Sequence, residues 1–283
     1  MTLSKEAPGG AARGSTQVIV VDGVRVATRS AGAGEPLVLL HRSGGTLDDW
    51  DPALVNELAH VRRVITFDSA GVGETGGETP PTVEPMADFA AAVIRSLGMG
   101  STDILGWSLG GFVSQVLAVK HPGLVRRLIL AGTMAPAGSP EVLWSPEWLK
   151  AASTPVPSAE IALSLFFTES QTSRSAGAAS FGRMVQPPAS YVSPAAMAAQ
   201  ADAITRFANN QGGWYVRLRE IAAPAFVANG DEDGLFPAID SAVLAREIPR
   251  SRLAIYPDSG HAFLFQYASR FSEDVERFLR DES

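Results

Sequence analysis

The five residues from Gly106 to Gly110 form a G-x-S-x-G pattern centred on Ser108. An apolar run precedes the pattern and helix-compatible sequence follows it, which is the strand–turn–helix context of a nucleophilic serine. Glycines two positions either side relieve the crowding at such a strained turn. The backbone N–H of Leu109 would then lie at a helix N-terminus, where it can stabilise a developing oxyanion. Alone, the pattern occurs often by chance, and a glycine-rich turn with an incidental serine is the alternative.

A serine hydroxyl needs a general base, and the chain has four histidines. His41 and His60 precede the serine, and His121 lies roughly 20 Å beyond it along the next helix, at ~1.5 Å per residue. His261 follows the last predicted strand, at 251–256, and therefore lies at the edge where doubly wound sheets gather their catalytic groups. The sequence thus predicts His261 as the base.

The base in turn needs a carboxylate to orient it. The polar loop at 229–237 supplies three candidates, Asp231, Glu232 and Asp233, and it also follows a predicted strand. Residue chemistry alone does not separate the three. At least two of them must be ordinary solvated turn residues.

Strand-like apolar runs alternate with stretches of helical periodicity over most of the chain. This alternation is typical of a doubly wound, mostly parallel α/β sheet, with an opening Asp22-Gly23 hairpin as its antiparallel edge. The predicted strands are 17–21, 25–29, 36–40, 61–67, 103–105, 124–131, 224–229 and 251–256. The predicted helices are 47–60, 83–97, 112–119, 238–247 and a final amphipathic helix to about residue 280.

The alternation stops between residues 134 and 219, where the chain is rich in Ala, Ser and Pro. This stretch is too long for a plain loop, so we expect a helical cap inserted between the sixth and seventh strands. The predicted organisation is a disordered leader at 1–15, an α/β core at 16–133 and 220–283, and the cap at 134–219.

Composition narrows the function classes further. The chain has 283 residues, of which 46% are hydrophobic, enough for one large domain with an insertion. The net charge of −7 and the lack of a basic block argue against nucleic acid or an anionic membrane as partner. The chain has no cysteine and only four dispersed histidines, so disulfides, a Cys nucleophile and a metal site are not expected.

The N-terminus lacks the apolar core of a signal peptide, and no uncharged apolar run approaches the ~20 residues that span a bilayer. We therefore expect a soluble, cytoplasmic protein that acts on a small-molecule substrate. A homodimer is compatible with the sequence.

The Ser108 pattern, the acidic loop and the Ser259-Gly260-His261 terminus together resemble the α/β-hydrolase fold superfamily, and the resemblance extends from about residue 17 to 280. In that family the acid lies three residues after a glycine and four before a proline. Asp233 has both spacings, so the resemblance implies Asp233 rather than Asp231.

The resemblance further implies a cofactor-free serine hydrolase that cleaves an ester, lactone or thioester through an acyl-enzyme. Related members with an aspartate at the position of Ser108, the haloalkane dehalogenases and epoxide hydrolases, use a different chemistry. Perhydrolase (haloperoxidase-like) activity or C–C bond hydrolysis on the same triad is an alternative. A non-catalytic ligand-binding protein on this fold is another.

One segment departs from the family pattern, which has a glycine after the histidine that follows the third strand. Here the residues are His41, Arg42 and Ser43. The resemblance assigns the second oxyanion N–H to Ser43. Arg42 either points into the pocket and binds a carboxylate or polarises a carbonyl, or it turns outward and pairs with Asp48 or Asp49.

Four residues are candidates for the substrate pocket: His41, Arg42, Trp107 and Trp144. Ligand pockets are mostly apolar with few polar groups, which suits the aromatic members of this set. The alternative for Trp107 is packing beneath the nucleophile. The alternative for Trp144 is packing of the cap on the core.

Overall fold

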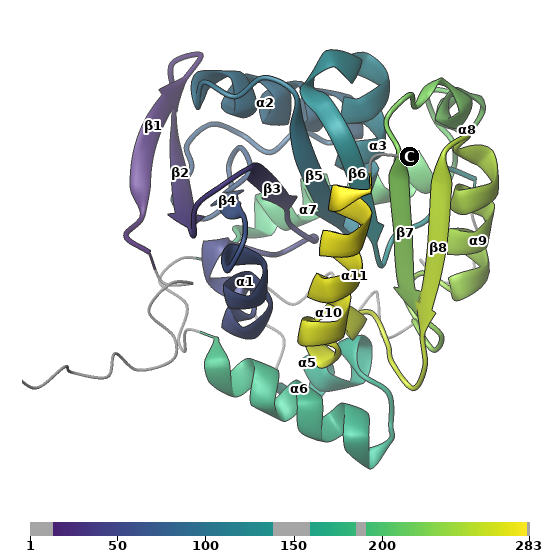
Figure 1. Cartoon of the computed structure of the whole chain (residues 1–283). Helices are drawn as coiled ribbons and strands as arrows, with labels where there is room; N and C mark the ends of the chain where they lie inside the picture. Colours follow the sequence, from purple (N-terminus) through teal and green to yellow (C-terminus); the bar gives the residue numbers. More distant parts are fainter. Residues whose placement is uncertain (1–13, 138–158, 185–190, 282–283) are drawn as a thin grey trace, which may run out of the picture.

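The computed structural model describes residues 14–137, 159–184 and 191–281 of the chain. Within these ranges an eight-stranded, mostly parallel sheet forms the centre, with helices on both of its faces (Figure 1). The predicted doubly wound α/β fold is confirmed. Trp144 and residues 1–13 of the predicted leader lie outside the described residues.

The sheet has a switch point where a ligand site is expected. Its strands are β1 (Gln17–Val21), β2 (Val24–Ala31), β3 (Pro36–Leu40), β4 (Arg63–Phe67), β5 (Thr102–Trp107), β6 (Val125–Ala131), β7 (Ala225–Gly230) and β8 (Ser251–Tyr256). Their spatial order is β1-β2-β4-β3-β5-β6-β7-β8, with β1 and β2 antiparallel to their neighbours and the rest parallel. The chain runs from β3 to β4 on one side and returns to β5 on the other. The crevice outside the carboxyl ends of β3 and β5 is therefore the expected ligand site.

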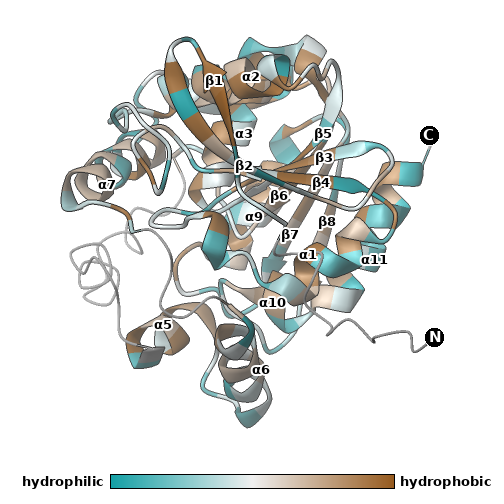
Figure 2. Ribbon diagram, turned by 90° about the vertical axis from the view of Figure 1, so that its left-hand side faces the viewer, coloured by the Kyte–Doolittle hydropathy of each residue, from teal (hydrophilic) through white to brown (hydrophobic). Residues whose placement is uncertain are grey.

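Two apolar clusters, one on each face of the sheet, form the core. On one face lie α1 (Pro52–Ala59), α10 (Phe263–Gln266) and α11 (Ala268–Arg280), and on the other lie α2 (Val83–Ser96), α3 (Leu109–Lys120) and α9 (Ala238–Glu247). All six residues of β5 are buried, as expected for a strand covered on both faces. Figure 2 shows largely hydrophobic central strands, whereas α11 carries both hydrophobic and hydrophilic residues.

The predicted helix at 47–60 is wrong in one respect, because the chain breaks it into two elements. A short 3-10 helix, η1 (Leu47–Asp49), precedes α1, which begins only at Pro52. The Asp51 side chain accepts a hydrogen bond from the Ala53 N–H over 2.9 Å. An aspartate at the N-cap followed by a proline in the first turn is a strong helix start, and it resets the helix at this point.

Several helices occupy the segment between β6 and β7, where the cap is predicted. They are α5 (Ala159–Phe166), α6 (Gln171–Arg183), α7 (Pro194–Ala208), α8 (Trp214–Arg217) and a 3-10 turn, η4 (Leu218–Glu220). Helices α5 and α6 lie beyond the carboxyl ends of the strands, whereas α7 packs against α2 and α3 (Figure 1). No helix in the described ranges is long and apolar enough to cross a membrane.

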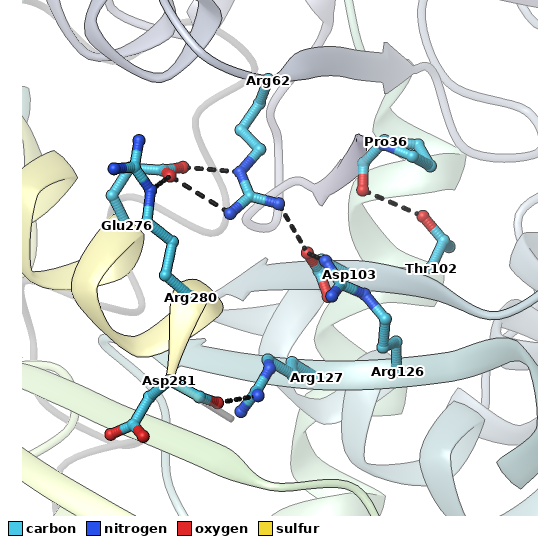
Figure 3. A network of polar contacts seen from close by, with 9 residues as sticks. All are labelled: Pro36, Arg62, Thr102, Asp103, Arg126, Arg127, Glu276, Arg280 and Asp281. Carbon is cyan, nitrogen blue, oxygen red and sulfur yellow. Dashed lines mark hydrogen bonds and ion pairs between the residues drawn. The ribbon is translucent and has the colours of Figure 1, made fainter. Parts of the chain in front are cut away.

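A polar network lies near the amino ends of the strands, away from the crevice (Figure 3). Asp103, at the start of β5, is fully buried and pairs with Arg62 and Arg126. Arg62 also forms a two-pronged contact with Glu276 of α11, at 2.8 and 3.1 Å. The network therefore ties the C-terminal helix to the base of the sheet.

Candidate active site

Ser108 stands in a strained turn between β5 and α3. Its φ is +58° and its ψ is −120°, a conformation that non-glycine residues rarely adopt. The Ser108 N–H donates to the Ala131 carbonyl over 3.0 Å, and the Ser108 carbonyl accepts from Thr133 Oγ1 over 2.9 Å. Strand β6 and the loop after it therefore hold both backbone groups of the serine.

The two glycines of the motif are required by close approach. A Cβ on Gly106 would lie 2.3 Å from the Gly110 carbonyl oxygen, and one on Gly110 would lie 2.1 Å from the Leu40 carbonyl oxygen. Both contacts are with backbone, which cannot move aside easily. The motif thus lets α3 start directly above the end of β3.

Leu109 is the first residue of α3, so its N–H has no acceptor within the helix. Among the described residues it donates no hydrogen bond. The residue lines a cavity at the carboxyl edge of the sheet. An N–H in this position, at the positive end of a helix, suits a developing negative charge.

His261 and Asp233 form a buried pair on the loops after β8 and β7. His261 Nδ1 lies 2.8 Å from Asp233 Oδ2, and both side chains are almost fully shielded from solvent. The other carboxylate oxygen, Asp233 Oδ1, accepts the N–H groups of Leu235 and Phe236 over 2.8 and 3.0 Å. Because Oδ2 accepts from Nδ1, the neutral imidazole carries its proton there and leaves Nε2 as a base.

The three carboxylates of the acidic loop have different environments. Asp231 and Glu232 are exposed, and Asp231 accepts the Ser259 N–H over 3.2 Å. Asp233 is buried and contacts His261. The geometry separates candidates that residue chemistry left equivalent.

The nucleophile turn and the histidine loop are joined through Trp107. Trp107 Nε1 donates to the His261 carbonyl over 3.0 Å, and the two rings lie 5.6 Å apart. Phe166 of α5 stacks on His261 at 5.8 Å. No hydrogen bond joins Ser108 and His261 in the described structure. Such bonds are often long in substrate-free enzymes and tighten when the substrate binds.

His41 is a neutral histidine at the end of β3. Its Nδ1 accepts the Arg42 N–H over 2.8 Å, so the ring proton resides on Nε2. Burial, and then the charge of Arg42, hold the pKa of His41 well below its usual range. A polar contact with the Asp49 backbone opposes this shift. That contact does not meet the geometry of a hydrogen bond. His41 Nε2 is therefore buried without a hydrogen-bond partner among the described residues.

Arg42 lines the cavity and also makes the predicted pairing with Asp49, while its predicted binding of a substrate group stays a prediction. It pairs loosely with Asp49, at 3.3 Å, and donates to the Ser43 carbonyl over 2.7 Å, while Asp48 pairs with a different arginine. Its guanidinium also lies over Phe166, 5.0 Å from the ring centre. The side chain is 19% exposed, and burial lowers its pKa.

Ser43 is held by a residue that the sequence analysis missed. Ser43 Oγ donates to Gln200 Oε1 over 3.0 Å, and the Gly44 N–H donates to the same oxygen over 2.8 Å. Gln200 lies on α7 and is 3% exposed. In the sequence, Gln200 could have been recognised because it is a glutamine among the small and apolar residues that form the buried face of this helix.

A small cavity of about 30 Å³ lies beside Leu109, and Ser108 and His261 are not among its lining residues. This volume holds one or two water molecules. The predicted pocket residues His41 and Arg42 line it, whereas Trp107 and Ser43 do not. Its other walls, mostly apolar, are Leu40, Gly45, Phe67, Ser69, Ala70, Thr79, Pro80, Met86, Phe89, Ala90, Leu109, Gly110, Val113 and Gln200.

Trp107 is 1% exposed and packs beneath the turn, which was the alternative to a pocket role. Trp144 lies outside the described residues. In the described ranges no group of three or more His, Cys, Asp or Glu side chains is arranged to hold a metal ion.

Comparison with known proteins identifies the family. The model for the alpha/beta hydrolase fold matches residues 35–267, and the chain belongs to this family. A 2-hydroxymuconate semialdehyde hydrolase from Pseudomonas sp. (strain CF600) is 30% identical over 271 residues, covering 93% of each chain. A poly(3-hydroxyalkanoate) depolymerase from Ectopseudomonas oleovorans is 27% identical, covering 87% of this chain and 85% of the relative.

A solved structure has the same fold over almost the whole length. An alpha/beta hydrolase fold protein from Chitinophaga pinensis is 35% identical, with a TM-score of 0.85, and the match covers 98% of this chain and 100% of that one. The fold of the family thus extends over almost the whole chain, whereas the two relatives from Pseudomonas sp. and Ectopseudomonas oleovorans are named for different substrates.

Proposed function

We propose that this protein is a serine hydrolase that cleaves a carboxylic ester, or a related lactone or thioester, of a small and largely apolar substrate. Ser108 is the nucleophile, His261 the general base and Asp233 the residue that orients the base. The apolar preference follows from the walls of the cavity, which include Phe67, Phe89 and other hydrophobic side chains.

The reaction has two halves. Ser108 Oγ attacks the acyl carbon while its proton passes to His261 Nε2, and the N–H of Leu109, together with that of Ser43, stabilises the tetrahedral oxyanion. His261 then protonates the leaving alcohol, and the acyl-enzyme remains. Water, deprotonated by His261, attacks the acyl group and releases the acid, with the proton returning to Ser108.

The single observation that carries the proposal is the Asp233–His261 contact. Its Nδ1–Oδ2 distance is 2.8 Å, and the other oxygen of Asp233 is fixed by two backbone N–H groups. Burial of a carboxylate is costly unless the group is paired and hydrogen-bonded, and Asp233 meets both conditions through His261 and the two backbone N–H groups. The pairing fixes the tautomer of His261, whose loop is joined to the turn of Ser108 through Trp107.

Covalent labelling by a fluorophosphonate probe tests the proposal. We expect stoichiometric labelling at Ser108, located by intact mass and tandem spectra, and none in Ser108→Ala. Ser272→Ala is a matched control, because Ser272 is also a buried serine but lies on α11. Folded wild-type protein that resists the probe, or an adduct elsewhere, would refute the nucleophile.

A carbon–carbon bond hydrolase is the second candidate. The relative from Pseudomonas sp. supports it, since its named substrate is an open-chain aldehyde acid without an ester bond. Hydrolysis of such a molecule must break a carbon–carbon bond. Comparing the kcat/KM for p-nitrophenyl butyrate with that for 2-hydroxymuconate semialdehyde separates the two candidates, and in both cases Ser108→Ala shows whether turnover occurs at this site.

A further inference from the structure

The backbone of the loop after β3 bonds little to itself, although Arg42 donates from its guanidinium to the Ser43 carbonyl over 2.7 Å and from its N–H to His41 Nδ1 over 2.8 Å. Its one backbone hydrogen bond within residues 41–45, from the Gly45 N–H to the Arg42 carbonyl, is long at 3.3 Å. Gly44 has a φ of +66°, so the backbone reverses sharply just after Ser43. Because this backbone bonds so little to itself, a contact from outside the loop adds to what fixes the direction of its N–H groups.

Gln200 is that outside contact. A single atom, Gln200 Oε1, accepts both the Ser43 hydroxyl at 3.0 Å and the Gly44 N–H at 2.8 Å. One donor is the side chain of Ser43 and the other is the N–H of the peptide that follows it, so the carboxamide holds the loop at the residue whose own N–H is the proposed oxyanion donor. That N–H donates to no described residue.

The same helix is fixed to the nucleophile side of the site. The buried face of α7 consists of Ala196, Gln200, Ala203, Ile204, Phe207 and Ala208. Phe207 stacks on Phe112 of α3, with ring centres 4.6 Å apart. Gln200 and Phe207 are seven residues apart, which is two turns, so they lie on one face roughly 10 Å from each other along the helix. Helix α7 therefore contacts both α3, which begins at Leu109, and the loop that carries Ser43.

Burial of the glutamine on this face needs a reason. Gln200 is 3% exposed, and a buried carboxamide is destabilising unless it is hydrogen-bonded. A hydrophobic residue would serve packing alone. Met197, one turn earlier, already packs against Gly44 and shows that an apolar contact with the loop is available.

We propose that Gln200 is a positioning residue for catalysis: it fixes the Ser43 N–H so that the two oxyanion donors, on separate elements, keep a set distance. The inference rests on the serine-hydrolase function proposed above. It makes the docking of α7, a helix of the predicted cap, a condition for an organised oxyanion hole.

The test compares Gln200→Met, which keeps the size and removes the acceptor, with Gln200→Glu, which keeps an oxygen at the same place. For p-nitrophenyl butyrate we expect Gln200→Met to lower kcat about 10- to 100-fold with little change in KM, since the lost interaction acts only in the transition state. The fluorophosphonate labelling rate should fall in parallel. Gln200→Glu keeps the acceptor but adds a negative charge near the oxyanion, so its kcat should lie between those of Gln200→Met and the wild type.

Gln115→Met is the matched control. Gln115 is a buried glutamine on α3 whose Nε2 donates to the Met134 carbonyl over 3.1 Å, away from the loop. We expect it to lower the Tm without the selective loss of kcat. Equal losses of kcat in both Met variants, or no loss in Gln200→Met, would overturn the inference and leave the proposed function standing. A wild-type protein that is not labelled at all would instead overturn the proposed function, and this inference with it.

Discussion

The indole N–H of Trp107 donates a hydrogen bond to the carbonyl of His261 over 3.0 Å. Trp107 directly precedes the nucleophile, so this contact fixes the position of the loop after β8 relative to the turn after β5. Gly132 leaves room for it, because a Cβ there would lie 3.2 Å from both partner atoms. The two loops that must cooperate in catalysis are thus joined by a bond outside the triad.

Trp107→Phe should remove the hydrogen bond that fixes the position of the loop after β8 relative to this turn. The His261 carbonyl would be left buried without its donor, at a cost of about 1–3 kcal/mol in the free energy of unfolding. We also expect a lower kcat, since small displacements of a base are costly. Urea unfolding and ester kinetics measure both effects.

Trp214→Phe is the matched control for this change. Its indole N–H donates to Glu84 Oε1 over 2.7 Å, in a part of the molecule away from the triad. A similar loss of kcat in the two variants would mean that the Trp107 bond has no particular role in placing the base.

Asp233→Asn should leave the fold intact and remove most of the activity. The amide oxygen can still accept the backbone N–H groups of Leu235 and Phe236, but the amide nitrogen then faces His261 Nδ1 and favours the wrong tautomer. In the analogous change of a serine protease the loss in kcat is about 10⁴-fold, and we expect at least about 10³-fold here. Asp231→Asn, in the same loop but exposed, should stay near wild type. Equal effects in the two variants would contradict the assignment.

Much of the fold could be predicted from local signals. The strands at 17–21 and 251–256 and the helix at 238–247 have the predicted bounds, because apolar runs end at clear turn residues. The helix at 47–60 was predicted wrongly because the capping signal of Asp51 was outweighed by the continuous helical pattern around it.

The candidate site was only partly predictable for a physical reason. Ser108 and His261 stand in local patterns that can be read within a few residues. The choice between Asp231 and Asp233 depends on which loop residue turns inward, and residue chemistry left it open. The contact of Gln200 with Ser43 joins positions 157 residues apart. It depends on how α7 docks, which no local pattern encodes.

The neutral state of His41 predicts a specific pH dependence of stability. Its pKa in the folded protein lies well below the value of 6.5 expected in the unfolded chain. Below pH 6.5 the unfolded state therefore binds more protons, and stability falls as the pH drops. The slope approaches about 1.4 kcal/mol per pH unit until the folded-state pKa is reached.

His41→Gln removes this titration. Urea unfolding of both proteins at pH 7.5 and 5.5 should show that the wild type loses about 1 kcal/mol more than the variant over this interval. Parallel losses in the two proteins would mean that His41 is protonated in the folded state at pH 5.5.

Breaking the polar network around Asp103 at the base of the sheet should lower the free energy of unfolding strongly and leave the catalytic rate unchanged. Arg62→Met would leave the buried carboxylate of Asp103 with one arginine partner fewer and release Glu276 on α11. Removal of one partner from a buried ion pair costs about 3–5 kcal/mol, and we expect the lower value because Arg126 remains. Urea unfolding measures the loss, while the kcat of the folded variant should be unchanged.

Arg277→Met is the control for the network. Arg277 pairs with Asp274 at 3.2 Å but is 73% exposed, so its loss should cost at most about 1 kcal/mol. If Arg62→Met were no more costly than this surface substitution, the network would not be what holds α11 to the sheet.

Arg42 is the one formally charged residue in the described lining of the cavity. Only two N–H groups of its guanidinium have described hydrogen-bond partners, one on Ser43 and one on Asp49, which leaves guanidinium donors for a substrate carboxylate. A charge-assisted hydrogen bond contributes about 1.5–3 kcal/mol, so Arg42→Gln should lower the kcat/KM for an ester with a carboxylate on its acyl chain about 10- to 100-fold. The neutral ester of the same length should change little, and so should both esters in the exposed control Arg174→Gln. Equal losses of kcat/KM for the charged and the neutral ester would show that Arg42 stabilises the loop and does not recognise the charge of the substrate.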